Sequence, residues 1–283
     1  DEPFADSSAI PVLCVARLAR QHVTVALSGE GGDEVFAGYQ TYAATKLAGW
    51  YRRAVPAAAR RIIARLVARL PVSHRKVSFE YKAKRFVAGA SLQATEAHLS
   101  WKAIFNEEAK RTLYGEARPG LRPTARLYRD AAATVPSREF LSQLLAIDTH
   151  LGLEGDMLVK VDRMTMATSL EARVPLLDHP LVELVAGIPS NLKLHGLTTK
   201  YLLRKAMRDR LPRQTTQAPK QGFNVPIPSW LLGPLKEIMH DTLGAERIAR
   251  AGLFQPSVVG EIIRQHESHE RDNSRDIWTL LMF

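Results

Sequence analysis

A glycine-rich turn that carries three carboxylates is the part of this sequence with the clearest chemistry. It reads SGEGGDE from Ser28 to Glu34 and follows a short apolar run. Its glycines permit backbone torsions and close approach that a side chain would forbid, and the helix expected from about Asp33 points free amides back at the turn, where they attract anions. Because Glu30, Asp33 and Glu34 would repel a bare phosphate, we expect Mg²⁺ between these acids and a nucleotide or pyrophosphate.

The elements around the turn follow from the apolar pattern. Val23, Val25 and Leu27 alternate with smaller residues in a run too short for a helix, which predicts a buried strand before the turn. Two familiar phosphate motifs do not fit, because no GxxxxGK[ST] occurs and Gly29-x-Gly31 has no glycine at the sixth position. The residues alone leave a second interpretation open, in which the acids of a tight strand-to-helix connection merely complement the helix dipole.

Most of the remaining chain is expected to be helical. An apolar pattern from Ser137 to about Met166 predicts long helices broken near Gly152 and Gly155. One strand among so many helices cannot form a sheet. We therefore expect the remaining strands to lie in sequence that precedes this chain.

Two helix starts can be placed nearer the C-terminus. Asp178 is a candidate N-cap for a short helix that ends near Gly187. Thr198 or Thr199 could cap the next helix, which is expected to stop at Pro212. That helix would carry Lys200 and Arg204, four residues apart, on one face. From the residues alone these two would be a solvated basic face.

Several segments together resemble the synthetase domain of glutamine-hydrolysing asparagine synthetases. The central ones are SGEGGDE, then DMLVKVDRMTMATSLEARVPLLD at 156–178 and TKYLLRKAMRDRL at 199–211. The opening DEPFADSSAIP and the later PKQGFNVPIPSWL fit the same family. The resemblance covers most of the chain, and only the stretch from about 43 to 143 carries little of it. The order of these segments is far more specific than one glycine-rich turn.

The resemblance implies an α/β parent fold of the adenine nucleotide alpha hydrolase-like, ATP pyrophosphatase type. Residues 1–283 would be the C-terminal portion of that domain, itself predominantly α-helical with few strands. The family's N-terminal glutaminase domain, with its cysteine nucleophile, and its SGGxDS loop are absent from this sequence, which begins at Asp1. We therefore expect the isolated chain to be weakly active or inactive. The parent's glutaminase domain would be its partner, and a homodimer is left open.

In the family, the aspartate side chain attacks the α-phosphate of ATP to give β-aspartyl-AMP and pyrophosphate, and ammonia from glutamine then displaces AMP. By resemblance, Ser28 and Gly29 contact the nucleotide with Gly31 beside them, and Asp33 helps to hold Mg²⁺. Glu30 matches the acid tied to formation and use of the adenylate, and it could accept a proton from the attacking ammonia. Lys200 matches the lysine that faces the phosphates and would stabilise the pyrophosphate leaving group.

A second group of residues lies in the segment that closes the family's site. Asp162, Arg163, Glu171 and Arg173 could place a buried acid and an arginine fork against the substrate. A structural network of ion pairs explains these four residues equally well. Arg204 belongs with them as a candidate for substrate contact or ion pairing.

Composition is that of a globular protein with an excess of positive charge. Length of 283 residues and 46% hydrophobic content are ample for one large or two modest cores, and a single cysteine excludes a disulfide scaffold and a Cys-based zinc site. No apolar run approaches the roughly 18 residues that span a bilayer, and no signal peptide pattern opens the chain. We therefore expect a soluble, cytoplasmic protein.

The net charge of +10 is densest between Tyr51 and Arg85. Arg60, Arg61, Arg65 and Arg69 interleave there with aliphatic residues, which predicts an amphipathic helix with a basic face. A solvated helix packed on the core is the favoured interpretation, and RNA, an anionic membrane surface or an acidic partner remain open. Nucleic acid is disfavoured because no aromatic-rich platform accompanies the charge.

Three functions follow from these observations. ATP-dependent asparagine synthesis is the leading one, with this chain supplying part of the adenylation site. A paralogue could instead amidate or cyclise another carboxylate, as relatives do in surface-polymer and β-lactam pathways. The third is a non-catalytic basic interaction module. Aspartate-dependent amide formation would support the first, transfer to another carboxylate the second, and nucleic-acid or membrane binding without nucleotide affinity the third.

Overall fold

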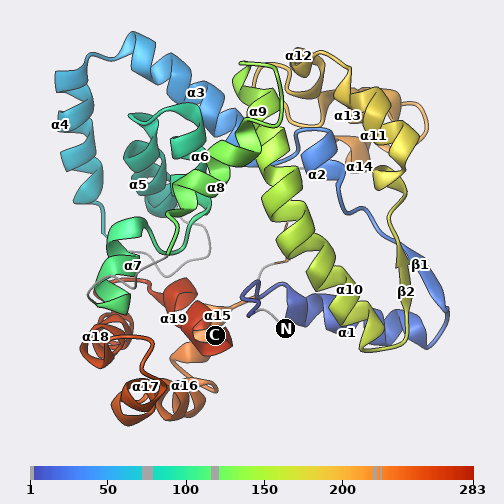
Figure 1. Ribbon diagram of the computed structural model, residues 1–283. Helices are drawn as coiled ribbons and strands as arrows, with labels where there is room; N and C mark the ends of the chain where they lie inside the picture. The colour runs from blue at the N-terminus through green and yellow to red at the C-terminus, as the bar shows by residue number, and fades with distance from the viewer. Residues whose placement is uncertain (1–2, 72–78, 116–120, 219–221, 224) are drawn as a thin grey trace.

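The computed structural model describes residues 3–71, 79–115, 121–218, 222–223 and 225–283. Within them the chain is mostly helical, as the sequence predicts, and it has two short strands (Figure 1). No helix in this described part is both long and apolar enough to cross a bilayer. Parts of two segments that carry the resemblance, 1–2 and 219–221 with 224, lie outside the described residues.

The helices and strands fall into three consecutive groups along the chain. The N-terminal ones are α1 (Ala9–Arg20), β1 (Val25–Leu27), α2 (Gly32–Val35), α3 (Gln40–Ala54), α4 (Ala57–Ala68), α5 (Phe79–Ala90), α6 (Ala94–Lys102) and α7 (Glu107–Tyr114). The central ones are α8 (Thr124–Ala132), α9 (Phe140–Ile147), a π-helix (Asp148–Leu158), α10 (Val159–Met166), β2 (Glu171–Arg173), a 3₁₀ turn (Pro175–Leu177) and α11 (His179–Ala186). The C-terminal ones are α12 (Ser190–Lys193), α13 (Tyr201–Ala206), α14 (Arg213–Gln217), α15 (Ile227–Leu231), α16 (Lys236–Leu243), α17 (Ala245–Ala251), α18 (Pro256–Glu267) and α19 (Ser274–Met282).

The strand before the turn differs from expectation in two ways. β1 pairs in parallel with β2, with Ala26 opposite Ala172, so a two-stranded sheet does form. The strand is also not buried, since Val25 is 44% and Leu27 77% exposed. The expectation of a lone strand was wrong because β2 reads Glu-Ala-Arg and carries no apolar or β-branched pattern. The expectation of burial was wrong because this small sheet lies at the edge of the molecule (Figure 1).

One long, continuous helical rod crosses the molecule from α9 through the π-helix to α10 (Figure 1). The expected break near Gly152 and Gly155 does not occur, because both glycines lie within the π-helical turns. A π-helix keeps the rod hydrogen-bonded while adding a residue per turn, and such segments are frequent at functional sites. Its last turn leads into α10, which packs along α1.

The helix expected after Asp178 is present as α11, and Asp178 and Gly187 flank it as predicted. The helix expected after Thr198 or Thr199 begins later. Lys200 is its N-cap residue, and α13 covers Tyr201–Ala206 and ends before Pro212. Neither threonine is therefore the N-cap.

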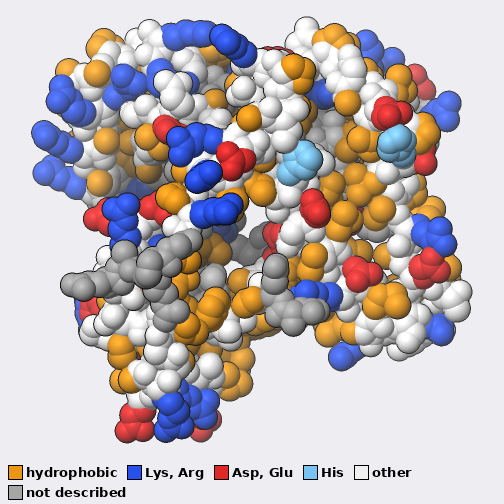
Figure 2. Space-filling view, in the orientation of Figure 1, with side chains coloured by type: hydrophobic (Ala, Val, Ile, Leu, Met, Phe, Trp, Pro, Cys, Tyr) orange, Lys and Arg blue, Asp and Glu red, His pale blue; other side chains and the backbone are white. Residues whose placement is uncertain are grey.

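The described part of the basic stretch between Tyr51 and Arg85 covers the end of α3, all of α4 and the start of α5. α4 packs against α5, and none of its 12 residues, all of which the structure describes, is buried. Figure 2 shows Lys and Arg side chains clustered over this edge of the molecule, with hydrophobic side chains between them. The basic amphipathic helix that the sequence predicts is thus confirmed in position.

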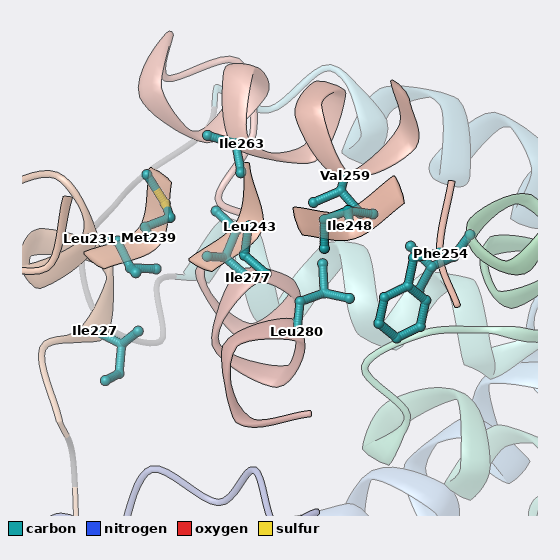
Figure 3. Packing of buried hydrophobic residues seen from close by; sticks show 11 residues of the cluster. Ile227, Leu231, Met239, Leu243, Ile248, Phe254, Val259, Ile263, Ile277 and Leu280 are labelled. Atoms are coloured by element: carbon teal, nitrogen blue, oxygen red, sulfur yellow. The ribbon is translucent and has the colours of Figure 1, made fainter. Parts of the chain in front are cut away.

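Two hydrophobic cores hold the helices together. The first lies among α3, α8 and α9 and includes Tyr42, Leu144 and Ile147, each 0% exposed. The second is built by α15–α19 with Leu113 of α7, and Figure 3 shows its side chains converging from these helices. Leu231 and Met239 are 0% exposed at its centre. The candidate site lies with the first core.

Candidate active site

The glycine-rich turn joins β1 to α2 in a tight conformation. At its start the Ser28 amide donates to the Arg173 carbonyl at 2.7 Å, which continues the pairing of β1 with β2. Gly31 has φ of +79°, a conformation that favours glycine, and a Cβ there would overlap the side chain of Leu177. The short helix α2 then begins at Gly32, close to the start that the sequence predicts. Gly29 is exposed at the surface of the turn.

Lys200 reaches this turn from 167 positions further along the chain. Its Nζ lies 2.9 Å from Oδ1 of Asp33, and both side chains are partly exposed, at 26% and 21%. Its backbone adopts the left-handed conformation with φ of 51°, and its amide donates to the Ala37 carbonyl at 3.3 Å. Strained torsions of this kind are kept where surrounding structure demands them. The structure thus brings the predicted lysine and the predicted metal ligand together.

Gly38 makes this approach possible and was not among the predicted site residues. A Cβ at Gly38 would collide with the Asp33 carboxylate and with the Lys200 side chain. A Cβ at Gly32 would lie 3.4 Å from Lys200 Nζ. The amide of Gly38 also donates to the Asp33 carbonyl at 2.7 Å, which closes the loop between α2 and α3. The signal in the sequence was the further glycine in VFAGY, whose role depends on a distant lysine.

Arg204 does not share a helix face with Lys200, which lies outside α13. Its guanidinium donates instead to the Thr216 carbonyl at 3.1 Å and the Ala218 carbonyl at 3.2 Å. These contacts tie α13 to α14. The prediction of a shared basic face was wrong because the left-handed backbone at Lys200 turns that residue away from the helix.

The four residues of the closing segment separate into two kinds. Arg173 Nε lies 2.5 Å from Glu171 Oε1 on β2, and these side chains are 66% and 51% exposed. Asp162 is exposed on α10, and Arg163 is half-buried. The expected buried acid is therefore not found in Asp162 or Glu171, since both residues are exposed. Glu171 and Arg173 thus pair with each other, and substrate contact by this group stays a prediction.

A buried polar network around Asp148 lies beside the turn. Asp148, at the first turn of the π-helix, is 1% exposed and accepts hydrogen bonds from Tyr42 at 2.6 Å, His98 Nε2 at 2.9 Å and Lys102 Nζ at 2.5 Å. Burial acts to raise its pKa, but the His98 hydrogen bond and the Lys102 charge outweigh burial, so the pKa lies below its usual value.

Lys102 connects this network to the turn. Its Nζ lies 4.5 Å from the centre of the Tyr39 ring, and the Tyr39 hydroxyl donates to Glu34 Oε1. Glu34 is 2% exposed, and its burial raises its pKa. Glu34 therefore acts as a fixed internal acceptor. Apart from Glu34, these residues were missed because the partners of Asp148 lie 46 to 106 positions away from it in sequence, and no local pattern marks them.

Asp156 is a second acid that the sequence-based site did not include. It lies in the last turn of the π-helix, where burial raises its pKa to about 6, with Asp6 and Glu30 adding to the rise and Lys160 and Lys102 opposing it. Lys160 Nζ is itself 2.9 Å from Asp6 Oδ2 and is 5% exposed. The segment around Asp156 carries the resemblance, so this signal was within reach.

The described side chains contain no group of three His, Cys, Asp or Glu that could hold a metal ion alone. Mg²⁺ is commonly held by one or two carboxylates together with substrate phosphates. Asp33 offers such an oxygen beside a cation, and the exposed Gly29 lets a ligand approach the backbone. The residues present therefore fit a magnesium-bound triphosphate.

Comparison with known proteins places the chain in a family. The family model described as asparagine synthase matches residues 1–283. The chain is 34% identical to asparagine synthetase [glutamine-hydrolyzing] 1 of Bacillus subtilis and 35% identical to a putative asparagine synthetase [glutamine-hydrolyzing] of Mycobacterium tuberculosis, with all of this chain and 43% and 42% of those proteins covered.

A third relative is more distant. Amidase chyE of Penicillium rubens is 23% identical over 93% of this chain and 41% of its own length. The chain thus spans less than half the length of the curated relatives it matches. On the match over its whole length and on these identities, it belongs to the asparagine synthase family.

Proposed function

We propose that this chain supplies part of the adenylation site of a glutamine-hydrolysing asparagine synthetase. The single observation that carries the proposal is the pairing of Lys200 with Asp33 across the Ser28–Glu34 turn. It joins a cation and a carboxylate from distant segments, leaves both partly exposed, and requires glycine at position 38. A purely structural ion pair would need neither solvent access nor a strained lysine backbone.

Before substrate binds, the ammonium of Lys200 and the carboxylate of Asp33 neutralise each other. Once substrate is bound, Lys200 can turn its ammonium to the departing pyrophosphate, and Asp33 would hold the magnesium ion that accompanies ATP. When bound, that ion screens the repulsion between the aspartate carboxylate and the triphosphate. The aspartate oxygen bonds to the α-phosphorus, the bond from that phosphorus to the α,β-bridging oxygen breaks, and the products are β-aspartyl-AMP and pyrophosphate.

Glu30 serves the second step. Ammonia bonds to the acyl carbon, AMP leaves with its oxygen, and the nitrogen must give up a proton. Glu30 is half-buried at the turn and lies close enough to Asp156 to raise the pKa of that acid. Glu30 accepts the proton, and Asp156 adds a second acid whose pKa burial raises to about 6.

The relatives' names support glutamine as the source of ammonia, and their greater length leaves room for further domains. We propose a glutaminase domain and an SGGxDS loop in the parent protein, an ATP pyrophosphatase-type α/β parent fold, and weak or no synthesis by this chain alone. The cytoplasm remains the predicted compartment.

A second function is supported by one specific observation. The similarity to amidase chyE extends over 93% of the chain, so the same framework is compatible with another carboxylate or another amine. The third, non-catalytic function is supported by the exposed basic helix α4. The Lys200–Asp33 pair fits the first two functions and is not explained by the third. The 34% and 35% identities to asparagine synthetases favour aspartate over another carboxylate.

Isotope transfer tests the proposal in the parent protein. Aspartate labelled with ¹⁸O in its side-chain carboxylate should deliver one ¹⁸O atom to AMP, detected by mass spectrometry, and release pyrophosphate. Glutamate and other labelled carboxylates provide the comparison. Label transfer only from another acid would establish the second function. Production of ADP, or of unlabelled AMP, would refute the adenylate.

A further inference from the structure

The positive charge of this protein is concentrated in one stretch of sequence. From Val35 to Phe79 there is neither Asp nor Glu, against a net charge of +10 for the whole chain. Its described residues form α3 and α4. Tyr42 of α3 belongs to the network around Asp148, whereas α4 takes no part in the candidate active site. The stretch contains nine cations: Lys46, Arg52, Arg53, Arg60, Arg61, Arg65, Arg69, Arg75 and Lys76.

A cavity lies where α4 meets the end of α3 and α5. Its volume is about 320 Å³, and Arg60, Arg61, Tyr51 and Ser91 supply polar groups to a wall that is otherwise alanine and valine. The Tyr51 hydroxyl is buried and has no hydrogen-bond partner among the residues that the structure describes. Its ring is held by an edge contact with Phe86 at 5.8 Å. A buried hydroxyl without a partner beside two guanidinium groups is suited to an anionic oxygen.

The outer face of α4 carries apolar side chains beside its arginines. Ile62 and Leu66, one turn apart, are 58% and 59% exposed, and Arg61 and Arg65 precede them one position earlier in each turn. Trp50, near the end of α3, is 45% exposed. Arginine and aliphatic rows on one exposed helix face are typical of helices that lie in a membrane interface.

We propose that α3, α4 and α5 form a docking surface for a membrane rich in anionic phospholipid. Arg60, Arg61 and the Tyr51 hydroxyl bind one lipid phosphate in the cavity, while Ile62 and Leu66 enter the lipid interface. Charge complementarity selects an anionic occupant, because this stretch has no acid to offset its cations. The exposed Ile and Leu favour lipid over nucleic acid. The ridge that α4 forms at the edge of the molecule fits a deformable lipid surface (Figure 1).

Vesicle flotation of the full parent protein tests this surface. Binding is expected to vesicles of phosphatidylcholine with phosphatidylglycerol, to weaken with salt, and to be absent with phosphatidylcholine alone. Replacing Arg60 and Arg61 with Gln should lower the partition coefficient roughly 30-fold. The matched control replaces Arg247 and Arg250, two exposed arginines of α17, and should change it less than about twofold. Equal losses in both double variants would refute a specific surface.

A second pair of variants separates lipid from soluble phosphate. Ile62→Ser with Leu66→Ser keeps every charge, and it should weaken vesicle binding while leaving any affinity for glycerol 3-phosphate or inorganic phosphate unchanged. Tight binding of those soluble ions without vesicle binding would overturn the lipid assignment. Stronger retention on RNA or on an acidic polypeptide would overturn it in favour of another partner.

Measurements of folding and of asparagine synthesis on the same variants serve as controls for the vesicle experiments. Circular dichroism and the melting temperature should be unchanged in all these variants, because the replaced side chains are on the surface. Asparagine formation should also persist, since α4 is separate from the turn at Ser28. Loss of vesicle binding without loss of asparagine synthesis would therefore test the docking surface independently of the active site. Normal binding after loss of both arginines would show that vesicles bind through another surface, and would contradict the proposal.

Discussion

At the scale of single residues, Lys200 and Asp33 neutralise each other while remaining open to solvent. We expect Lys200→Gln in the parent protein to lower kcat for aspartate-dependent pyrophosphate release by roughly 10²–10³-fold, because the leaving group loses a fixed cation. Lys205→Gln is the matched control, since it removes an exposed lysine of the adjoining helix. A pyrophosphate-release assay gives both rates. Equal rates for the two variants would remove Lys200 from the site.

The raised pKa of Asp156 predicts how the stability of the protein changes with pH. Its pKa is raised to about 6 from a usual value of 3.8, so the folded state holds a proton that the unfolded state has lost between these values. The contribution of Asp156 to stability is therefore present at low pH and is lost as the pH rises from about 4 to about 6.

Asp156→Asn should remove the loss of stability that the wild type shows as the pH rises from about 4 to about 6. Its melting temperature should match the wild type near pH 4 and exceed it at pH 7, where the wild type buries an ionised carboxylate. Asp130→Asn changes an exposed acid on α8 and should give no such pH-dependent difference. A melting-temperature difference that is constant across this pH range would show that the environment of Asp156 is not as described.

At the scale of elements, an ion pair between Lys102 of α6 and Asp148 of the π-helix joins the two helices in addition to their packing. Lys102→Met should lower the free energy of unfolding by about 2 kcal/mol, since it leaves Asp148 buried with less compensation and Lys102 is only partly exposed. Lys110→Met breaks a more exposed pair with Glu107 and should cost under about 1 kcal/mol. Urea unfolding measures both.

The pH dependence of these unfolding free energies tests whether Lys102 acts through its charge. Because the pKa of Asp148 lies below its usual value, its contribution to stability is present at neutral pH and is lost on acidification. The two lysine variants should therefore differ most at neutral pH and converge at low pH. A difference that persists in acid would show that Lys102 acts through packing alone.

The elements show what local pattern can and cannot predict. The Ser28–Glu34 turn was accessible from sequence because its glycines and acids lie side by side, and α2 begins within one residue of the expected start. β2 was missed because a Glu-Ala-Arg strand has no β pattern and gains its ladder only from β1. The π-helix was expected to be a break because glycine usually ends helices, whereas the rod continues through Gly152 and Gly155.

Long-range contacts set the limit for the candidate site. Resemblance, and not spacing, linked Lys200 to the turn, and nothing local predicts the bond from Tyr42 to Asp148 across 106 positions. Gly38 acquires its meaning only when Lys200 is beside it. Sequence thus indicated the chemistry of the turn, while its partners had to be found in the fold.

At the scale of the whole molecule, the two hydrophobic cores predict two zones of stability. Met239→Ala, at the centre of the core formed by α15–α19, should cost about 2–5 kcal/mol and speed hydrogen exchange mainly within those helices. Leu144→Ala should instead affect α3, α8 and α9. Hydrogen-exchange mass spectrometry distinguishes the two patterns. Uniform acceleration across both zones in either variant would show a single cooperative unit.

The central claim is that the turn at Ser28–Glu34, faced by Lys200, binds a magnesium-complexed triphosphate. The most direct measurement is a crystal structure of the parent protein with a non-hydrolysable ATP analogue and Mn²⁺ in place of Mg²⁺, located by anomalous scattering. We expect the ion between the Asp33 carboxylate and the phosphates, with Lys200 released from Asp33 onto the β- and γ-phosphates. Nucleotide and ion bound elsewhere, with the Lys200–Asp33 pair intact at 2.9 Å, would contradict it.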